Sequence, residues 1–320
     1  MSSEWKNISE ESWKKLENII EQEMLTPEEI RDNLEVTEKG RIRQSIQNCK
    51  YVLEYAPCLR GAVCRNEMTC QIDIKKKVPW KRRGVQMTDT DMNNLSLYLE
   101  KNYGLTSDRV IAKAIDIVAN DNSFHPIIDL LESLKWDGRP RISGMLTHFF
   151  GAENPEYAGE VMKIHMLVAI SRLYEPGKKY DIMLCLVGGQ GTGKSTFFKY
   201  LAIQDEWFTD DVKRLDDKKV YEYLQGHWIV EMSEMNAVAN AKSIEETKSF
   251  LSRQKDTYRI PYERRAEDRY RQCVFCGTSN DLAFLPFDRT GNRRFGPVKV
   301  CPEKAETTIY RDEKGSREYI

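Results

Sequence analysis

One segment near the middle of the chain constrains the fold more than any other. A continuous apolar run at residues 181–187, Asp-Ile-Met-Leu-Cys-Leu-Val, leads directly into Gly-Gly-Gln-Gly-Thr-Gly-Lys-Ser at residues 188–195. Such a run is typical of a strand buried on both faces, and a helix is expected from Lys194 to about Leu201. The segment matches the phosphate-binding pattern GxxxxGK(S/T) in the strand–loop–helix context that the pattern requires. It predicts an α/β fold around a nucleotide site.

The residue types of this loop suit a nucleoside triphosphate. Glycines let the backbone curl so that successive N–H groups face the phosphates, and the helix N-terminus adds its positive dipole end. Lys194 is expected to reach the β- and γ-phosphates and Ser195 to coordinate Mg²⁺, so the predicted cofactors are ATP and Mg²⁺. The alternative is a glycine-rich turn that binds nothing. The predicted cofactor-binding residues are Gly188, Gly189, Gln190, Gly191, Thr192, Gly193, Lys194, Ser195 and Thr196.

Hydrolysis also needs carboxylates at the end of a neighbouring strand. Residues 227–232, His-Trp-Ile-Val-Glu-Met, read as a buried strand closed by Glu231, and Glu234 follows three residues later. One carboxylate would complete the Mg²⁺ shell, and the other would orient or deprotonate the attacking water. The spacing does not assign these two roles. The predicted metal ligands are Ser195 and Glu231, and ordinary surface glutamates are the alternative.

A third apolar run, residues 273–280, ends in small polar residues. In ATPases of the AAA+ type, a polar residue at this strand tip senses the γ-phosphate. Asn280 occupies that place, with Thr278 and Ser279 as candidate helpers.

Two arginines follow a glycine turn in residues 288–295. Arg293 or Arg294 would suit a finger that reaches the nucleotide of a neighbouring subunit. The alternative is a surface turn with salt bridges.

Residues 253–271 hold seven basic and four acidic side chains with three interleaved tyrosines. Positive charge follows phosphates and aromatic rings stack on bases, so the segment is a candidate for contact with single-stranded DNA. The alternative is a solvated surface. The formal net charge of −1 excludes a wholly basic nucleic-acid coat but leaves room for such local patches. The candidate DNA-binding residues are Lys255, Arg259, Arg264 and Arg265.

Cys273 and Cys276 have a metal-like CxxC spacing, but residues three apart on a strand point to opposite faces. Buried thiols are therefore favoured over a zinc site. No run reaches the roughly 18 apolar residues of a membrane helix, and the N-terminus lacks the pattern of a signal peptide. A cytoplasmic protein with reduced cysteines and no membrane partner is expected.

The remaining sequence predicts two parts before a P-loop ATPase domain with leading helices at residues 141–320. Residues 1–44 form an acidic helical segment, with helices at residues 9–23 and from Thr26. Residues 45–140 form an α+β, mostly helical accessory domain. In that domain, strands at 59–64 and 67–74 are expected around a turn at 65–66, followed by a basic run at 75–83 and a helix at 89–103.

Several short sequence blocks along the chain together resemble the virulence-associated protein E family of phages and mobile elements. That family is related to superfamily-3 helicases and poxvirus replication ATPases. The resemblance covers about residues 45–300. It rests on Gly-Gln-Gly-Thr-Gly-Lys-Ser-Thr at 189–196 and on blocks at 124–127, 131–138, 207–210, 224–231, 248–253, 258–262, 277–280 and 290–295.

The resemblance implies a ring-forming ATPase with an AAA+, superfamily-3-helicase-like core that acts in mobile-element DNA replication. Its implied partners are single-stranded DNA in the ring pore and further copies of the chain in a hexamer-type ring. No primase domain precedes residue 45, so primer synthesis is not expected, and relatives continue with further helices, so a fragment is expected. The implied catalytic residues are Lys194, Glu231, Glu234, Asn280, Arg293 and Arg294.

The favoured function is an ATP-dependent DNA helicase or translocase. The alternative is a nucleotide-gated DNA-binding or assembly ATPase that does not translocate. A small-molecule kinase is disfavoured because no distinct lid separates Lys194 from Asn280. A GTPase is disfavoured because no Asn-Lys-x-Asp motif is present.

Overall fold

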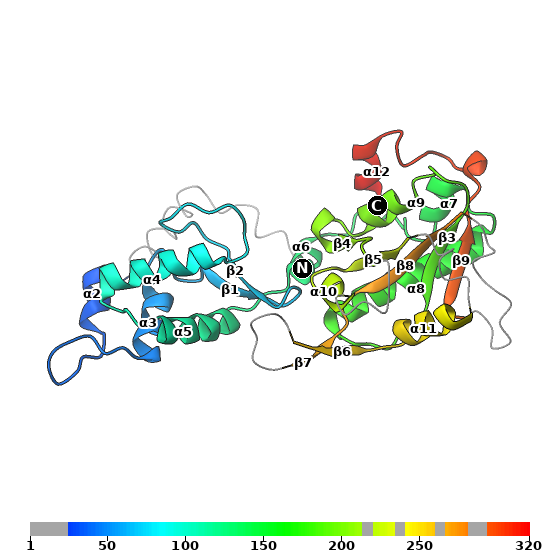
Figure 1. The fold of residues 1–320 in the computed structure, drawn as a ribbon. Coiled ribbons are helices and arrows are strands. Elements are labelled where there is room, and N and C mark those ends of the chain that lie inside the picture. The colour runs from blue at the N-terminus through cyan, green and yellow to red at the C-terminus, as the bar shows by residue number, and fades with distance from the viewer. Residues whose placement is uncertain (1–24, 213–219, 234–240, 260–265, 281–292) are drawn as a thin grey trace, which may run out of the picture. The chain divides into compact units, whose positions relative to one another are not determined.

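The computed structural model describes residues 25–212, 220–233, 241–259, 266–280 and 293–320. They belong to two compact units, Met1–Pro126 and Ile127–Ile320, coloured from blue to cyan-green and from green to red in Figure 1. The helix expected at residues 9–23 lies outside the described residues. The domain limits expected after residues 44 and 140 stay predictions. None of the helices within the described ranges is long and apolar enough to cross a membrane.

The first unit packs helices and a hairpin around one apolar core. The helix predicted at residues 89–103 is confirmed, and the left-handed Gly104 (φ 64°) ends it. Thr26 caps the helix that begins at Pro27, because its hydroxyl accepts the N–H of Glu29. The elements of this unit are α2 (Pro27–Asp32), α3 (Ile46–Tyr55), β1 (Val63–Asn66), β2 (Gln71–Ile74), α4 (Asp89–Tyr103) and α5 (Asp108–Asp121).

The hairpin β1–β2 turns later than the sequence predicts. Because β1 runs to Asn66, the expected turn at residues 65–66 is wrong, and the turn comprises residues 67–70. Asn66 initiates that turn, since its Oδ1 accepts the N–H groups of Met68 and Thr69. Asparagine commonly plays this part at the start of a turn.

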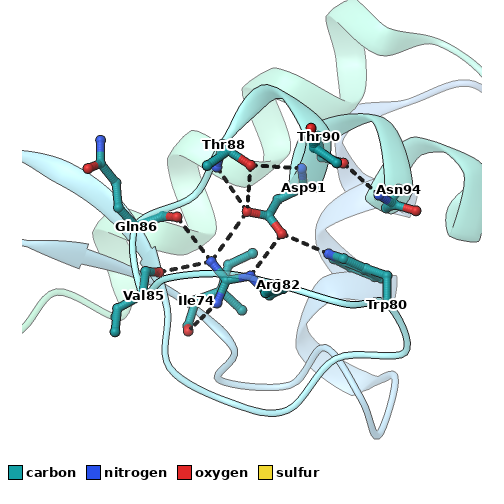
Figure 2. A network of polar contacts seen from close by, with 9 residues as sticks. All are labelled: Ile74, Trp80, Arg82, Val85, Gln86, Thr88, Thr90, Asp91 and Asn94. Atoms are coloured by element: carbon teal, nitrogen blue, oxygen red, sulfur yellow. Dashed lines mark hydrogen bonds and ion pairs between the residues drawn. The ribbon is translucent and has the colours of Figure 1, made fainter.

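Arg82, within the basic run at residues 75–83, lies in a polar network (Figure 2). Its Nε donates to Oδ1 of Asp91 on α4 at 2.8 Å. Burial raises the pKa of Asp91, but hydrogen bonds from Arg82, Trp80 and Thr88 outweigh it and hold that pKa well below its usual range. Arg82 thus ties its loop to α4. Its remaining acceptors are the carbonyls of Ile74, Val85 and Gln86.

The second unit is built on a five-stranded parallel sheet with the order β4–β5–β8–β3–β9. The three strands expected at the loop, at Glu231 and before Asn280 are β3, β5 and β8, so a mixed α/β unit is confirmed. Its elements are α6 (Pro126–Ser133), α7 (Met145–Phe150), α8 (Pro155–Tyr174), β3 (Met183–Val187), α9 (Lys194–Leu201), β4 (Phe208–Thr209), α10 (Val220–Leu224), β5 (Ile229–Met232), α11 (Ala241–Leu251), β6 (Lys255–Tyr258), β7 (Glu267–Tyr270), β8 (Val274–Ser279), β9 (Phe295–Lys299) and α12 (Glu313–Tyr319).

Helices cover both faces of this sheet. Cys185 of β3 and Val230 of β5 pack with Phe250 of α11 in one apolar cluster. Successive side chains of a strand alternate between faces, so Glu231 points to the other face. There it meets Ser195 at the start of α9.

Because the five strands are parallel, their carboxyl ends meet at one edge. The phosphate loop follows β3 at this edge, and the N–H of Gly188 donates to the carbonyl of Ser279 at the end of β8, at 3.1 Å. The hairpin β6–β7 leads into the start of β8 and therefore lies at the opposite edge, low in the view of Figure 1. A buried ion pair between Arg271 and Asp256 (2.6 Å) fixes its base.

Candidate nucleotide site

The loop after β3 and the first turn of α9 form the candidate nucleotide site. The ammonium of Lys194 donates to the carbonyls of Gly188 and Gly189, each at 2.7 Å. Burial lowers the pKa of Lys194, while the negative charge of Glu231 acts in the opposite direction. The loop therefore curls around Lys194 and holds its charge at the centre.

Gly193 is required here for two separate reasons. Its φ of 86° lies in the left-handed region, which residues with a Cβ rarely adopt. A Cβ at this position would also collide with Ile309 and lie 3.3 Å from the ring of Tyr310. Both the backbone conformation and the packing of the C-terminal segment on the loop therefore demand glycine.

Ser195, Glu231 and Thr278 come together from α9, β5 and β8. The hydroxyls of Ser195 and Thr278 both donate to Oε1 of Glu231, each at 2.7 Å. In the register, Glu231 lies beside Cys276, which places Thr278 two residues further along on the same face. The structure brings the two predicted metal ligands into contact. Thr278, expected only as a helper at the strand tip, holds the carboxylate.

Glu231 is fully buried. Burial raises its pKa, and the hydrogen bonds from Ser195 and Thr278 lower it in part. Its Oε2 is also buried and accepts no hydrogen bond from the described residues. A buried carboxylate oxygen without a partner is costly, so this atom is suited to a ligand.

The donor set here fits Mg²⁺. The hydroxyl of Ser195 and the carboxylate of Glu231 are hard oxygen ligands of the kind that Mg²⁺ prefers, and Mg²⁺ is commonly bound by one or two protein groups together with substrate phosphates. The ammonium of Lys194 and the N-terminus of α9 supply the positive charge that those phosphates need. The residues present therefore fit a magnesium–nucleoside triphosphate.

Asp210 brings a second carboxylate to the same edge. It follows β4, which pairs with β5, and its charge acts together with burial to raise the pKa of Glu231. The sequence predicted no role for Asp210, although this residue closes the block at residues 207–210. Glu234, the other predicted acid, lies outside the described residues, and its role stays a prediction.

Asn280 is exposed and directly follows Ser279, whose carbonyl accepts the N–H of Gly188. Strand β8 lies between β3 and β5. Asn280 therefore lies beside the loop, at the end of the strand between the loop and Glu231. Its sensing role stays a prediction.

Arg293 and Arg294 lie at the opposite edge of the sheet, because the carbonyl of Arg294 accepts the N–H of Met183 at the start of β3. The length of β3 separates them from the loop of their own chain. Nε of Arg294 donates to Asp181 and Ser252, at 3.1 Å in each case, whereas Arg293 is exposed. A finger role in trans stays a prediction.

Two of the four predicted DNA contacts lie in the described part of the hairpin. Lys255 and Arg259 are exposed, and Lys255 forms an ion pair with Asp268. Arg264 and Arg265 lie outside the described residues. The paired charges leave this surface less positive than its sequence indicates.

Cys273 and Cys276 are buried at and within β8, as expected for core thiols, and burial raises the pKa of both. Within the described ranges, the structure places no three His, Cys, Asp or Glu side chains together as a metal cluster.

The C-terminal segment also contributes to this site, which the sequence did not predict. Ile309 is buried against the loop, and the hydroxyl of Tyr310 lies 3.2 Å from Oγ1 of Thr196. No periodicity or motif in residues 301–320 marks these two residues.

Residues 131–318 match the model of a family described as the virulence-associated protein E-like domain. Two solved apo structures of the NrS-1 C-terminal region align with 15% sequence identity and a TM-score of 0.47. The alignment covers 80% of this chain, and the chain spans 62% of the length of those structures. No curated protein matches the sequence.

Proposed function

Since the chain belongs to the virulence-associated protein E-like family, we propose that it is a Mg²⁺-dependent ATPase with an AAA+, superfamily-3-helicase-like core. The observation that carries the proposal is the 2.7 Å hydrogen bond from Ser195 to Glu231 beside the phosphate loop. It joins the two groups that would share one Mg²⁺.

In this proposal Lys194 binds the β- and γ-phosphates, and Ser195 and Glu231 hold the metal ion that neutralises the phosphate charge. Burial of Glu231 keeps water away from the carboxylate and strengthens its interaction with a cation. Asn280 senses the γ-phosphate from the end of β8. Glu234 or Asp210 orients the attacking water.

The substrate polymer that we propose is single-stranded DNA, moved by a ring of identical subunits during phage or mobile-element DNA replication. The support is the hairpin β6–β7, which presents Lys255 and Arg259 at the edge opposite the loop. The hairpin leads directly into β8, so a shift of β8 on hydrolysis would move it. Arg293, exposed near that same edge, would complete the site of a neighbouring subunit.

A second candidate is a nucleotide-gated DNA-binding or assembly ATPase that does not translocate. The ion pairs Lys255–Asp268 and Arg271–Asp256 favour it, because they neutralise two of the basic side chains in the described part of the hairpin that could otherwise contact a phosphate backbone.

The experiment is an ATPase assay with and without single-stranded DNA, on wild type, Arg259→Glu and the matched control Lys163→Glu on α8. The proposal predicts that DNA stimulates hydrolysis and that Arg259→Glu alone loses stimulation. A rate indifferent to DNA, with no DNA retained at low salt, would contradict the DNA part. Strand displacement on forked DNA separates the two candidates, since only a translocase releases the strand.

A further inference from the structure

The end of the chain is anchored next to the phosphate loop. The N–H groups of Glu306 and Thr307 both donate to the carbonyl of His148, at 3.1 and 3.2 Å. The ring of Tyr319 stacks on that of His148, with centroids 4.4 Å apart. Ile309, between these anchors, is only 1% exposed. Residues 306–319 are thus fixed on the core of the second unit.

Tyr310 is placed by these anchors at the N-terminus of α9. Its hydroxyl lies 3.2 Å from Oγ1 of Thr196, and its ring lies 3.3 Å from the position of a Cβ on Gly193. The residue is nevertheless 59% exposed. One part of the ring therefore rests on the loop, and much of the rest is open to solvent.

The chemistry of the loop fixes which end of a nucleotide meets this ring. Lys194 and Ser195 serve the β- and γ-phosphates and the metal. Lys194 contacts the carbonyls of Gly188 and Gly189 at the start of the loop, and Ser195 contacts Glu231 on β5. The nucleoside lies at the other end of the triphosphate, past the α-phosphate held by the first N–H groups of α9. Thr196 directly follows the loop pattern on α9, and the hydroxyl of Tyr310 contacts it.

We propose that the ring of Tyr310 stacks on the base of the bound nucleotide and sets the affinity of the site for a nucleoside over a bare polyphosphate. This inference rests on the proposed function. An exposed aromatic ring provides a flat apolar surface that every base can stack on. Such a contact is tolerant of base identity, so it favours purine and pyrimidine nucleotides over inorganic triphosphate without selecting one base.

The test measures binding of Mg²⁺–ATP and of inorganic triphosphate by calorimetry to wild type, Tyr310→Ala, Tyr310→Phe and Lys194→Ala. Tyr174→Ala, at another exposed tyrosine, which ends α8, is the matched control. We expect Tyr310→Ala to weaken the binding of ATP about tenfold, as the loss of one stacking contact would. The affinity for inorganic triphosphate should not change. Tyr310→Phe and Tyr174→Ala should bind ATP like wild type.

Each other outcome overturns the inference. Equal ATP affinity in wild type and Tyr310→Ala removes the stacking role. An equal loss of ATP and inorganic triphosphate means that Tyr310 only supports the loop, and a loss in Tyr310→Phe means that the hydroxyl and not the ring matters. If the wild-type protein binds neither ATP nor inorganic triphosphate, the proposed function itself is refuted. If the phosphate loop is the binding site, Lys194→Ala loses both ligands, whereas Tyr310→Ala loses affinity for ATP alone.

Discussion

Ser195 and Glu231, 36 residues apart in the sequence, share a 2.7 Å hydrogen bond across the C-terminal edge of the parallel sheet. The contact exists because β5 and β3 are parallel neighbours of β8, so that the loop after β3 and the end of β5 meet. Glu231 is buried, and its Oε2 has no donor within the described residues. This geometry suits a carboxylate that binds a metal cation.

Replacing Thr278 with Val should shift the pH dependence of hydrolysis. The pKa of Glu231 is raised by burial and lowered by the hydroxyls of Ser195 and Thr278. Loss of one hydroxyl raises that pKa, so the ionised form that binds metal disappears at a higher pH. We expect the acidic limb of the kcat/KM profile to move to higher pH, with about tenfold lower activity on that limb. Thr278→Ser should behave like wild type, and identical profiles for Val and Ser would contradict the role of the hydroxyl.

Arg293 and Arg294 should separate into two roles. Arg294 bonds to Asp181 and Ser252, so Arg294→Ala should lower the melting temperature. Arg293→Ala should retain ATP binding but lower kcat about a thousandfold, the typical effect of losing an arginine finger. Mixing Arg293→Ala with Lys194→Ala should restore part of the activity, because one chain supplies the intact loop and the other the finger. A mixture as inactive as its components would contradict action in trans.

His165 on α8 should make the second unit sensitive to acid. It is completely buried, neither ring nitrogen has a hydrogen-bond partner in the described part of the chain, and burial lowers its pKa to about 4. The unfolded chain protonates this residue near pH 6.5, so stability is fully present above that pH and is lost as the pH falls toward 4. The loss amounts to about 3 kcal/mol. Urea unfolding of His165→Leu should show a flatter pH dependence than wild type; an equally steep one would refute this origin.

Arg82→Met should destabilise the first unit by about 3 kcal/mol, because it leaves the buried carboxylate of Asp91 without its cationic partner. Lys81→Met, the adjacent exposed basic residue, should change the free energy of unfolding by less than about 0.5 kcal/mol. Urea denaturation followed by tryptophan fluorescence measures both. Equal stabilities of the two variants would show that the network in Figure 2 contributes nothing.

Local sequence patterns predicted the elements of the site better than the contacts between them. The apolar runs identified β3, β5 and β8, and the loop pattern located Lys194 and Ser195, because burial on both faces and phosphate binding each leave a local signature. The hairpin turn predicted at residues 65–66 is wrong, because the pattern does not show that Asn66 starts a turn while still pairing as a strand residue.

Contacts made by distant segments leave no such signature. Thr278 meets Glu231 through strand register, and Tyr310 meets Thr196 through the anchoring of residues 306–319 on His148. The basic segment at residues 253–271 predicts contact with single-stranded DNA, but its Lys255 and Arg271 have acidic partners 13 and 15 residues away. Charge patterns along a chain cannot reveal such neutralisation.

The most direct test of the central claim is phosphate release from ATP by the full chain, with and without Mg²⁺, for wild type, Lys194→Ala and Glu231→Gln. Glu231→Gln keeps the size of the side chain and removes the charge that would hold the metal. The account predicts Mg²⁺-dependent hydrolysis by wild type, none by Lys194→Ala, and at least a hundredfold lower kcat for Glu231→Gln, about 3 kcal/mol of lost transition-state stabilisation. Hydrolysis by Lys194→Ala or Glu231→Gln at the wild-type rate would contradict it.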